Sequence, residues 1–161
     1  MKPVILIFGY GNLSRGDDAL APLLLENIEA KIDDKQVEIL TDFQLQIEHA
    51  LDLEERQLVL FIDASVACEH AFDLCELQPN KDNSYTTHAM SPASVLQVYQ
   101  SIKKAVPPPC FLLSIQGLSF ELGESLTSQA QQNLQQALEF TEQLLEHPEL
   151  KYWQAQVSHR A

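Results

Sequence analysis

The fold of this chain is decided by residues 4–18, which read VILIFGYGNLSRGDD. Residues 4–8 form a continuous apolar run, which is typical of a strand buried on both faces of a sheet. Gly9 and Gly11 then mark a turn, and the acidic pair Asp17 and Asp18 opens a segment whose apolar residues have helical spacing. A buried strand, a glycine turn and a helix in this order predict the first unit of a parallel sheet.

The same alternation continues along the chain. Apolar runs predict further buried strands over 37–40, 58–62 and 110–115, and a partly exposed edge strand over 72–77. Helical spacing predicts helices over about 18–30 and 45–53, from Ser91 onward, and from 127 or 128 to about 146. We therefore expect an α/β protein, a three-layer α/β/α sandwich around a twisted, mostly parallel sheet of about five strands. We expect one domain over 1–161, with its core over about 4–146 and a loosely held tail after Leu150.

Composition limits the possible partners. The chain has 161 residues and a formal net charge of -13, which argues against nucleic acid or an anionic membrane surface as the main partner. No apolar run is long enough for a signal core or a membrane span. The three cysteines form no CxxC pair, so neither a disulfide framework nor a structural zinc site is supported. We expect a cytoplasmic protein with reduced thiols, and the acidic surface fits a monomer.

Three acidic residues follow strands that end at the same edge of the predicted sheet. Asp18 follows the first strand, Asp42 the second, and Asp63 ends the third. Ligands bind at the carboxyl ends of such strands, and His88, which precedes the helix at Ser91, can reach the same edge. Asp and His donors without thiolates suit a divalent metal such as nickel or zinc, with one position open to substrate or water.

Each of these residues also has an ordinary structural explanation. A carboxylate at a helix N-terminus complements the helix dipole and stabilises it by roughly 0.3–1 kcal/mol, and we favour that role for Asp17. Asp63 alone could close a turn after its strand, and His88 alone could be a loop histidine. The other four histidines have no comparable context. The convergence of Asp18, Asp63 and His88 is what favours a metal site.

The glycine turn does not indicate a nucleotide cofactor. The third glycine of a dinucleotide fingerprint would fall at Ser14, and the acidic pair would repel a pyrophosphate at the helix N-terminus. The chain also lacks the Gly-Lys-Ser/Thr of a P-loop.

Several of these motifs together resemble the [NiFe]-hydrogenase maturation endopeptidases. The resemblance covers the opening GYGN turn with Asp17 and Asp18, the Ile62-Asp63-Ala64 strand end, and Thr87-His88 ahead of a Ser-Pro helix start. The DFQLQ stretch from Asp42, with Glu48 after it, resembles the branch that serves bidirectional, cytoplasmic hydrogenases. The family often has glycines after the acidic pair, whereas this chain has residues 19–21 as ALA.

The resemblance implies a nickel-dependent peptidase. Such enzymes cut a C-terminal extension from the hydrogenase large-subunit precursor once nickel has been inserted. The metal-binding positions of the family fall on Asp18, Asp63 and His88, and the acid after the second strand falls on Asp42, a candidate for activating water. The nickel would be carried by the precursor and would act as a recognition template. Two alternatives remain open: a nickel-checking chaperone that docks the precursor without cutting it, and a metal-dependent hydrolase of small amides.

Overall fold

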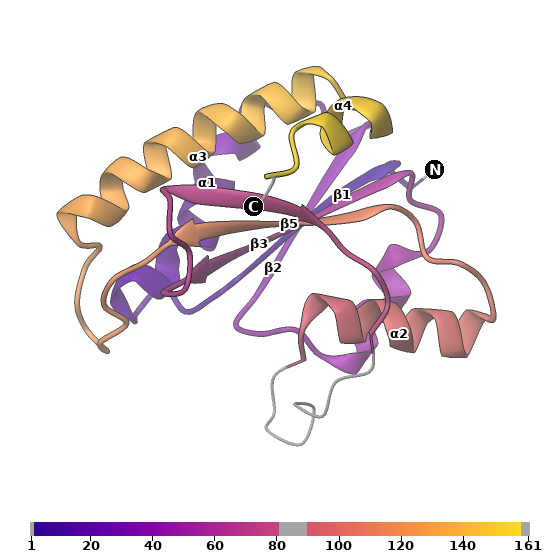
Figure 1. The fold of residues 1–161 in the computed structure, drawn as a ribbon, viewed down its shortest axis with the longest axis horizontal. Helices are drawn as coiled ribbons and strands as arrows, with labels where there is room; N and C mark the ends of the chain where they lie inside the picture. The colour runs from indigo at the N-terminus through magenta and orange to yellow at the C-terminus, as the bar shows by residue number, and fades with distance from the viewer. Residues whose placement is uncertain (1, 81–89, 159–161) are drawn as a thin grey trace.

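The computed structural model describes residues 2–80 and 90–158, and a five-stranded sheet runs through its centre (Figure 1). The strand order is β2-β1-β3-β5-β4, in which the first four strands are parallel and β4 is an antiparallel edge strand. This confirms the predicted α/β fold and the edge position of the fourth strand. The bounds are β1 Ile5–Tyr10, β2 Val37–Asp42, β3 Leu58–Ser65, β4 Phe72–Glu76 and β5 Cys110–Gln116.

Helices cover both faces of the sheet and form the two outer layers. In Figure 1, α3 and α4 lie on one side of the sheet and α2 on the other. The helices on the first side, with α1, contribute to one buried cluster, while α2 and η2 pack on a second cluster across the sheet. The bounds are η1 Gly16–Ala19, α1 Leu20–Glu29, η2 Ile47–Leu53, α2 Pro92–Lys103, α3 Ser128–Glu146 and α4 Leu150–Ala155.

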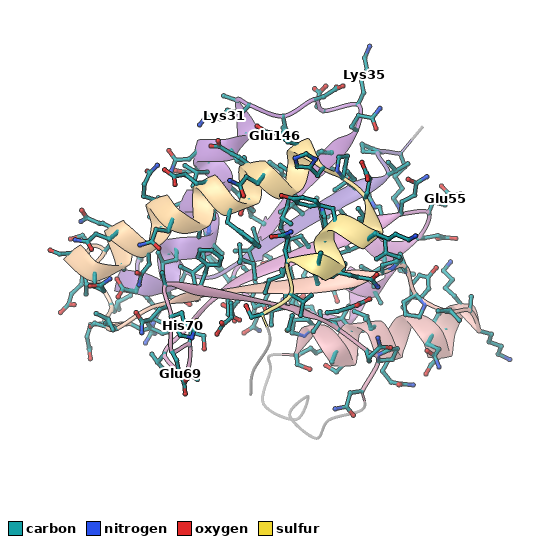
Figure 2. All side chains as sticks on the ribbon, turned by 45° about the horizontal axis from the view of Figure 1, so that its top comes forward. Lys31, Lys35, Glu55, Glu69, His70 and Glu146 are labelled. Carbon is teal, nitrogen blue, oxygen red and sulfur yellow. The ribbon has the colours of Figure 1, made fainter. Side chains whose placement is uncertain are left out.

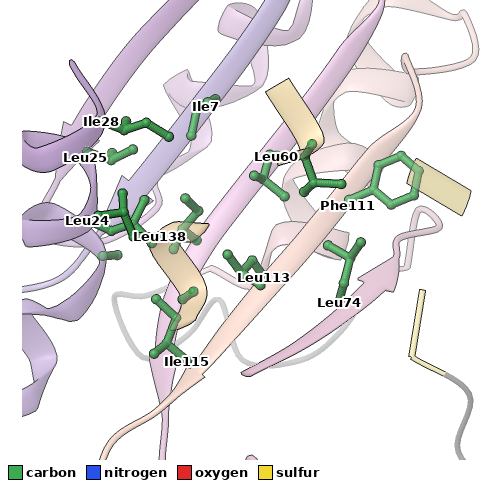
Figure 3. Packing of buried hydrophobic residues seen from close by; sticks show 14 of the residues in the cluster. Ile7, Leu24, Leu25, Ile28, Leu60, Leu74, Phe111, Leu113, Ile115 and Leu138 are labelled. Carbon is green, nitrogen blue, oxygen red and sulfur yellow. The ribbon is translucent and has the colours of Figure 1, made fainter. Parts of the chain in front are cut away.

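The larger cluster forms because β1, β3 and β5 are apolar on both faces. Figure 3 shows aliphatic side chains of α1, such as Leu24 and Ile28, beside those of the strands, such as Leu113. Full burial of one such side chain stabilises the fold by about 1.5–3 kcal/mol. The sheet is therefore fixed between two apolar layers, and polar groups gather where its strands end.

Two helices begin at the residues that the sequence indicates. Ser91 is the N-cap of α2, with Pro92 at the first helical position, and its hydroxyl accepts the Ser94 N–H at 3.1 Å. Thr127 is the N-cap of α3, and its hydroxyl accepts the Ala130 N–H at 3.2 Å.

The predicted boundaries differ at the edge of the sheet that carries the predicted site. Asp42 is the last residue of β2 rather than the residue after it, and β3 continues two residues beyond Asp63. The acidic pair lies in η1, a 3₁₀ turn of four residues that precedes α1. The helix expected over 45–53 is also a 3₁₀ helix, η2. Short 3₁₀ segments are common at helix ends and in connections, and sequence spacing alone does not separate them from α-helix.

The expectation of a loose tail after Leu150 is wrong for residues 150–158. Trp153 in α4 is 0% exposed, and its indole N–H donates to the Leu144 carbonyl at 2.9 Å. Its ring meets Phe111 of β5 edge to face, with centroids 5.4 Å apart. The Ser158 N–H donates to the Leu74 carbonyl at 2.9 Å. The tail is held because a large aromatic residue fills the core beside the sheet.

Candidate functional site at the carboxyl ends of the strands

Three polar side chains stand at the ends of β1, β2 and β3 on one face of the sheet. Tyr10 pairs in register with Asp42 across β1 and β2. Gly9 pairs with Ile62 across β1 and β3, so Asp63 lies level with Tyr10. Residues two positions earlier in each strand belong to the cluster beneath α2 and η2, and alternation puts all three side chains on that face. The sheet thus brings two predicted site residues, Asp42 and Asp63, to either side of Tyr10.

Asp18 reaches this edge through the glycine turn after β1. Gly11 has a φ of +154°, and a Cβ at this position would lie 2.1 Å from the Asp18 carbonyl oxygen. The Asn12 N–H donates to the Asp18 Oδ2 at 2.8 Å, and the Asp18 N–H donates to the Arg15 carbonyl at 3.0 Å. A glycine is required at position 11 because the turn folds back onto Asp18. The turn therefore fixes the Asp18 carboxylate against β1.

Asp18 and Asp63 influence each other electrostatically. Burial foremost, and then the negative charge of Asp18, raise the pKa of Asp63 to about 7. The hydroxyl of Tyr10 donates a hydrogen bond to Asp63 and opposes this rise. Burial, followed by the charge of Asp63, raises the pKa of Tyr10 well above its usual value. Tyr10 therefore stays a neutral donor beside Asp63.

The carboxylates of Asp18 and Asp63 could supply part of the ligand set of a divalent cation. Two neighbouring carboxylates that repel each other provide oxygen ligands whose repulsion a cation would relieve. No three His, Cys, Asp or Glu side chains within residues 2–80 and 90–158 gather as a complete metal cluster. The third predicted ligand, His88, lies outside the described residues. Met90 is the first described residue after it. The Met90 N–H donates to the carbonyl of Leu45 at 3.4 Å, and Leu45 follows Asp42 by three residues in the chain.

Asp42 has a partner that sequence analysis did not assign. Its Oδ2 lies 3.2 Å from the Nε2 of His49 in η2. Its Oδ1 accepts the N–H of Phe43 at 2.7 Å. The His49 side chain is 12% exposed and that of Asp42 is 39% exposed. The seven-residue separation gave no signal in the sequence, because the contact depends on the path of the chain between β2 and η2.

Asp17 also differs from the helix-start role expected for it. It is 0% exposed, and its side chain caps no N–H of its own helix. Its carboxylate instead accepts the backbone N–H groups of Leu118, Ser119 and Thr127 and the Thr127 hydroxyl. Although burial raises the pKa of this carboxyl, the hydrogen bonds outweigh it and hold the pKa below its usual value. Asp17 anchors the connection between β5 and α3 beside Asp18.

A groove of about 260 Å³ opens beside Asp42. Its rim carries Phe43, whose side chain is 72% exposed, and Leu13, which is also exposed. The groove is lined by Gly11, Leu13, Pro22, Thr41, Asp42 and Phe43. Two larger hollows, of about 420 and 570 Å³, lie at the opposite edge near Asp33 and contain none of the candidate residues. Of these three hollows, the groove at the carboxyl edge is the one that Asp42 lines.

Other histidines and cysteines in the described part of the chain lie on several elements. Figure 2 shows Glu69 and His70 on the turn that follows β3, where they project outward, and Lys35 and Glu55 toward the opposite edge. None of the three cysteines, all within the described part of the chain, forms a disulfide. Cys68 and Cys110 are buried, whereas Cys75 is exposed on β4. No helix in the described ranges is long and apolar enough to span a bilayer.

Several solved structures with the same fold are hydrogenase maturation proteases. The hydrogenase maturating endopeptidase HybD from E. coli is 25% identical, with a TM-score of 0.67 over 89% of this chain and 93% of that chain. The [NiFe] hydrogenase maturation protease HycI from Thermococcus kodakarensis is 21% identical, with a TM-score of 0.68 over 88% and 92%. The chain matches the [NiFe]-hydrogenase maturation proteases in structure. No protein-family model and no curated protein sequence matches it.

These matches cover nearly nine tenths of the chain. An endopeptidase from E. coli gives a TM-score of 0.68 at 24% identity over 89% of this chain and 93% of that chain. The resemblance noted in the sequence and the match in structure agree on the protease family. The branch that serves bidirectional hydrogenases stays a prediction.

Proposed function

We propose that this protein is an endopeptidase that removes the C-terminal extension of a [NiFe]-hydrogenase large-subunit precursor after nickel has been inserted. The observation that carries the proposal is the paired Asp18 and Asp63 at the carboxyl edge of a maturation-protease fold. Burial together with a second carboxylate raises the pKa of Asp63 to about 7, and such perturbation is common at functional sites.

In this proposal the nickel belongs to the substrate. Asp18, Asp63 and His88 contact the nickel that the precursor carries, with two oxygen donors and one nitrogen donor. Bound in this way, the metal marks a loaded precursor and orients the peptide to be cut. The hydrogen bond from Asn12 and the glycine turn hold Asp18 in place before the precursor arrives.

Asp42 is the group we assign to water activation. It shares a face with Asp63 but lies two strands away, on the far side of Tyr10. Its carboxylate is partly exposed, so water can reach it. A carboxylate within hydrogen-bond reach of a water can accept its proton as the water attacks the scissile carbonyl.

The groove beside Asp42 is where we place the substrate peptide. Gly11 and Thr41 line it, while Leu13 and Phe43 offer exposed apolar surface. An extended peptide lying there passes within reach of Asp42.

The expected partner is the precursor alone, in the cytoplasm. The enzyme acts as a monomer and without nucleotide, nucleic acid or membrane.

The test is cleavage of nickel-loaded precursor by the wild type and by Asp18→Asn, Asp63→Asn and His88→Ala. Each substitution is expected to abolish or strongly slow cleavage, with Asp34→Asn, an exposed acid at the opposite edge, as the matched control. Full activity in any two of the three variants would overturn the site assignment. A stable complex without loss of precursor mass would indicate the chaperone. Turnover of small amides without a partner, by a chain that retains metal on its own, would indicate the amidohydrolase.

A further inference from the structure

The inference concerns His49, the only histidine in the described part of the chain that contacts one of the predicted catalytic acids. The backbone N–H of Gln46 donates to His49 Nδ1 at 2.8 Å. A nitrogen that accepts this bond carries no proton, so in the neutral ring the proton resides on Nε2. Nε2 lies 3.2 Å from Asp42 Oδ2, so the protonated nitrogen faces that carboxylate oxygen.

The ring of His49 is fixed on three sides. Gln46 and His49 form a reciprocal cap at the start of η2, in which each side chain bonds the backbone of the other. The His49 ring also meets Phe8 of β1 edge to face, with centroids 4.6 Å apart. Leu45 anchors the preceding loop, since its side chain is fully buried. The ring cannot turn away from Asp42 without losing these contacts.

This geometry constrains how Asp42 presents its oxygens. Oδ1 accepts the N–H of Phe43, and the Nε2 of His49 lies 3.2 Å from Oδ2. Each carboxylate oxygen has two acceptor sites, so one site per oxygen remains for water. The Phe43 hydrogen bond and the His49 contact reach the carboxylate from different directions and hold its plane at the edge of β2.

We propose that His49 is a positioning residue for the hydrolytic reaction, holding the Asp42 carboxylate through its Nε2–H in the orientation that takes a proton from the attacking water. His49 itself does not touch the substrate. The inference rests on the proposed function, because it assumes that Asp42 activates the water.

Two substitutions separate positioning from packing. His49→Phe keeps an aromatic ring against Phe8 but removes the donor to Asp42. His49→Gln retains a side-chain N–H that can reach Asp42. Glu48→Gln, at an exposed neighbouring position of η2, is the matched control.

The experiment measures kcat and KM separately on nickel-loaded precursor, together with the thermal midpoint of each variant. We expect His49→Phe to lower kcat by about 10- to 100-fold, the range seen when a group that orients a ligand carboxylate is lost, with little change in KM. We expect His49→Gln to recover a large part of that loss and Glu48→Gln to match the wild type.

A second measurement keeps the inference testable if His49→Phe does not fold. Nitrogen NMR of the imidazoles in the wild type should show His49 protonated on Nε2 only, at a pH where the ring is neutral. A proton on Nδ1 would overturn the inference, as would a His49→Phe variant with wild-type kcat. If the wild type does not cleave loaded precursor, the proposed function is wrong and the inference falls with it. If the wild type cleaves and His49→Phe has the same kcat, only the inference is wrong.

Discussion

The carboxylate of Asp17 accepts two hydrogen bonds from Thr127, one from its backbone N–H and one from its hydroxyl, each at 2.8 Å. The same hydroxyl accepts the N–H of Ala130 and so caps α3. One buried carboxylate thus joins η1, which carries Asp18, to the start of a helix 110 positions later in the chain. The position of Asp18 depends on this junction as well as on its own turn.

Replacement of Asp17 by Asn should destabilise the fold. An amide has one oxygen acceptor instead of two. Its NH₂ group would face either the N–H of Thr127, at the place of Oδ1, or the N–H groups of Leu118 and Ser119, at the place of Oδ2. We expect a loss on the order of 3 kcal/mol in the free energy of unfolding, measured by urea titration at pH 7. Asp34→Asn should change it by less than about 0.5 kcal/mol, because Asp34 is exposed.

The contribution of Asp17 should also depend on pH. Because the folded pKa lies below that of the unfolded chain, at about 3.9, the stabilisation is complete above that value. As the pH falls through the folded pKa, the native carboxylate is protonated and the stabilisation is lost. The difference in stability between wild type and Asp17→Asn should therefore shrink below about pH 4. A constant difference from pH 7 to pH 3 would contradict this explanation.

The carboxyl group of Asp63 should titrate near pH 7 in the isolated protein, as measured by carbon NMR of the side chain. Asp18→Asn should lower this pKa without restoring the ordinary value, because burial, the larger cause, remains. Tyr10→Phe should raise the pKa, because the hydrogen bond that favours the ionised form is removed. Shifts of the same sign in both variants would show that these contacts are misassigned.

The raised pKa of Asp63 also predicts how stability changes with pH. Between about pH 3.9 and 7 the unfolded chain releases the proton that the folded protein retains. Asp63 therefore contributes stability below that window and loses it as the pH rises through 7. The free energy of unfolding of the wild type minus that of Asp63→Asn should therefore be smaller at pH 8 than at pH 4.

Gly11→Ala should disturb the site more than the fold. A Cβ at this position would meet the Asp18 carbonyl oxygen at 2.1 Å, so the turn must shift and carry the carboxylate away from Asp63. Gly123→Ala is the control, because Gly123 also has a positive φ but no atom lies within 4 Å of the place that a Cβ would take there. In both variants, backbone strain should lower the free energy of unfolding by about 1–3 kcal/mol. Only Gly11→Ala should also lower the pKa of Asp63 and slow cleavage.

Trp153→Ala should lower the free energy of unfolding by about 3–5 kcal/mol, as expected when a fully buried tryptophan is truncated. Circular dichroism during urea unfolding measures this loss. Lys151→Ala, at an exposed position of the same helix, should be nearly neutral. Trp153 is the only tryptophan, so wild-type fluorescence should change in the same transition as the global unfolding. An earlier fluorescence transition would mean that α4 detaches separately.

The parts of this structure that follow from local pattern were predictable. Apolar runs locate the buried strands, and parallel strands end together, so Asp42 and Asp63 fall on one edge without knowledge of any contact. The Ser91 and Thr127 caps are likewise readable because each side chain bonds an N–H three residues ahead.

The parts that depend on distant contacts were not predictable. The role of Asp17 is set by a loop about one hundred residues later, and no local spacing encodes that approach. The Asp42–His49 contact depends on the 3₁₀ geometry of η2, which turns the ring back toward β2. The burial of Trp153 is decided by the space that β5 and α3 leave between them.

The central claim is that this protein cuts a nickel-loaded precursor at the edge that carries Asp18 and Asp63. Intact mass spectrometry of the [NiFe]-hydrogenase large-subunit precursor, incubated with the wild-type protein with and without prior nickel loading, tests it most directly. We predict loss of one C-terminal peptide from the loaded precursor and no change in the unloaded one. An unchanged mass of the loaded precursor, or equal cleavage of both forms, would contradict the account.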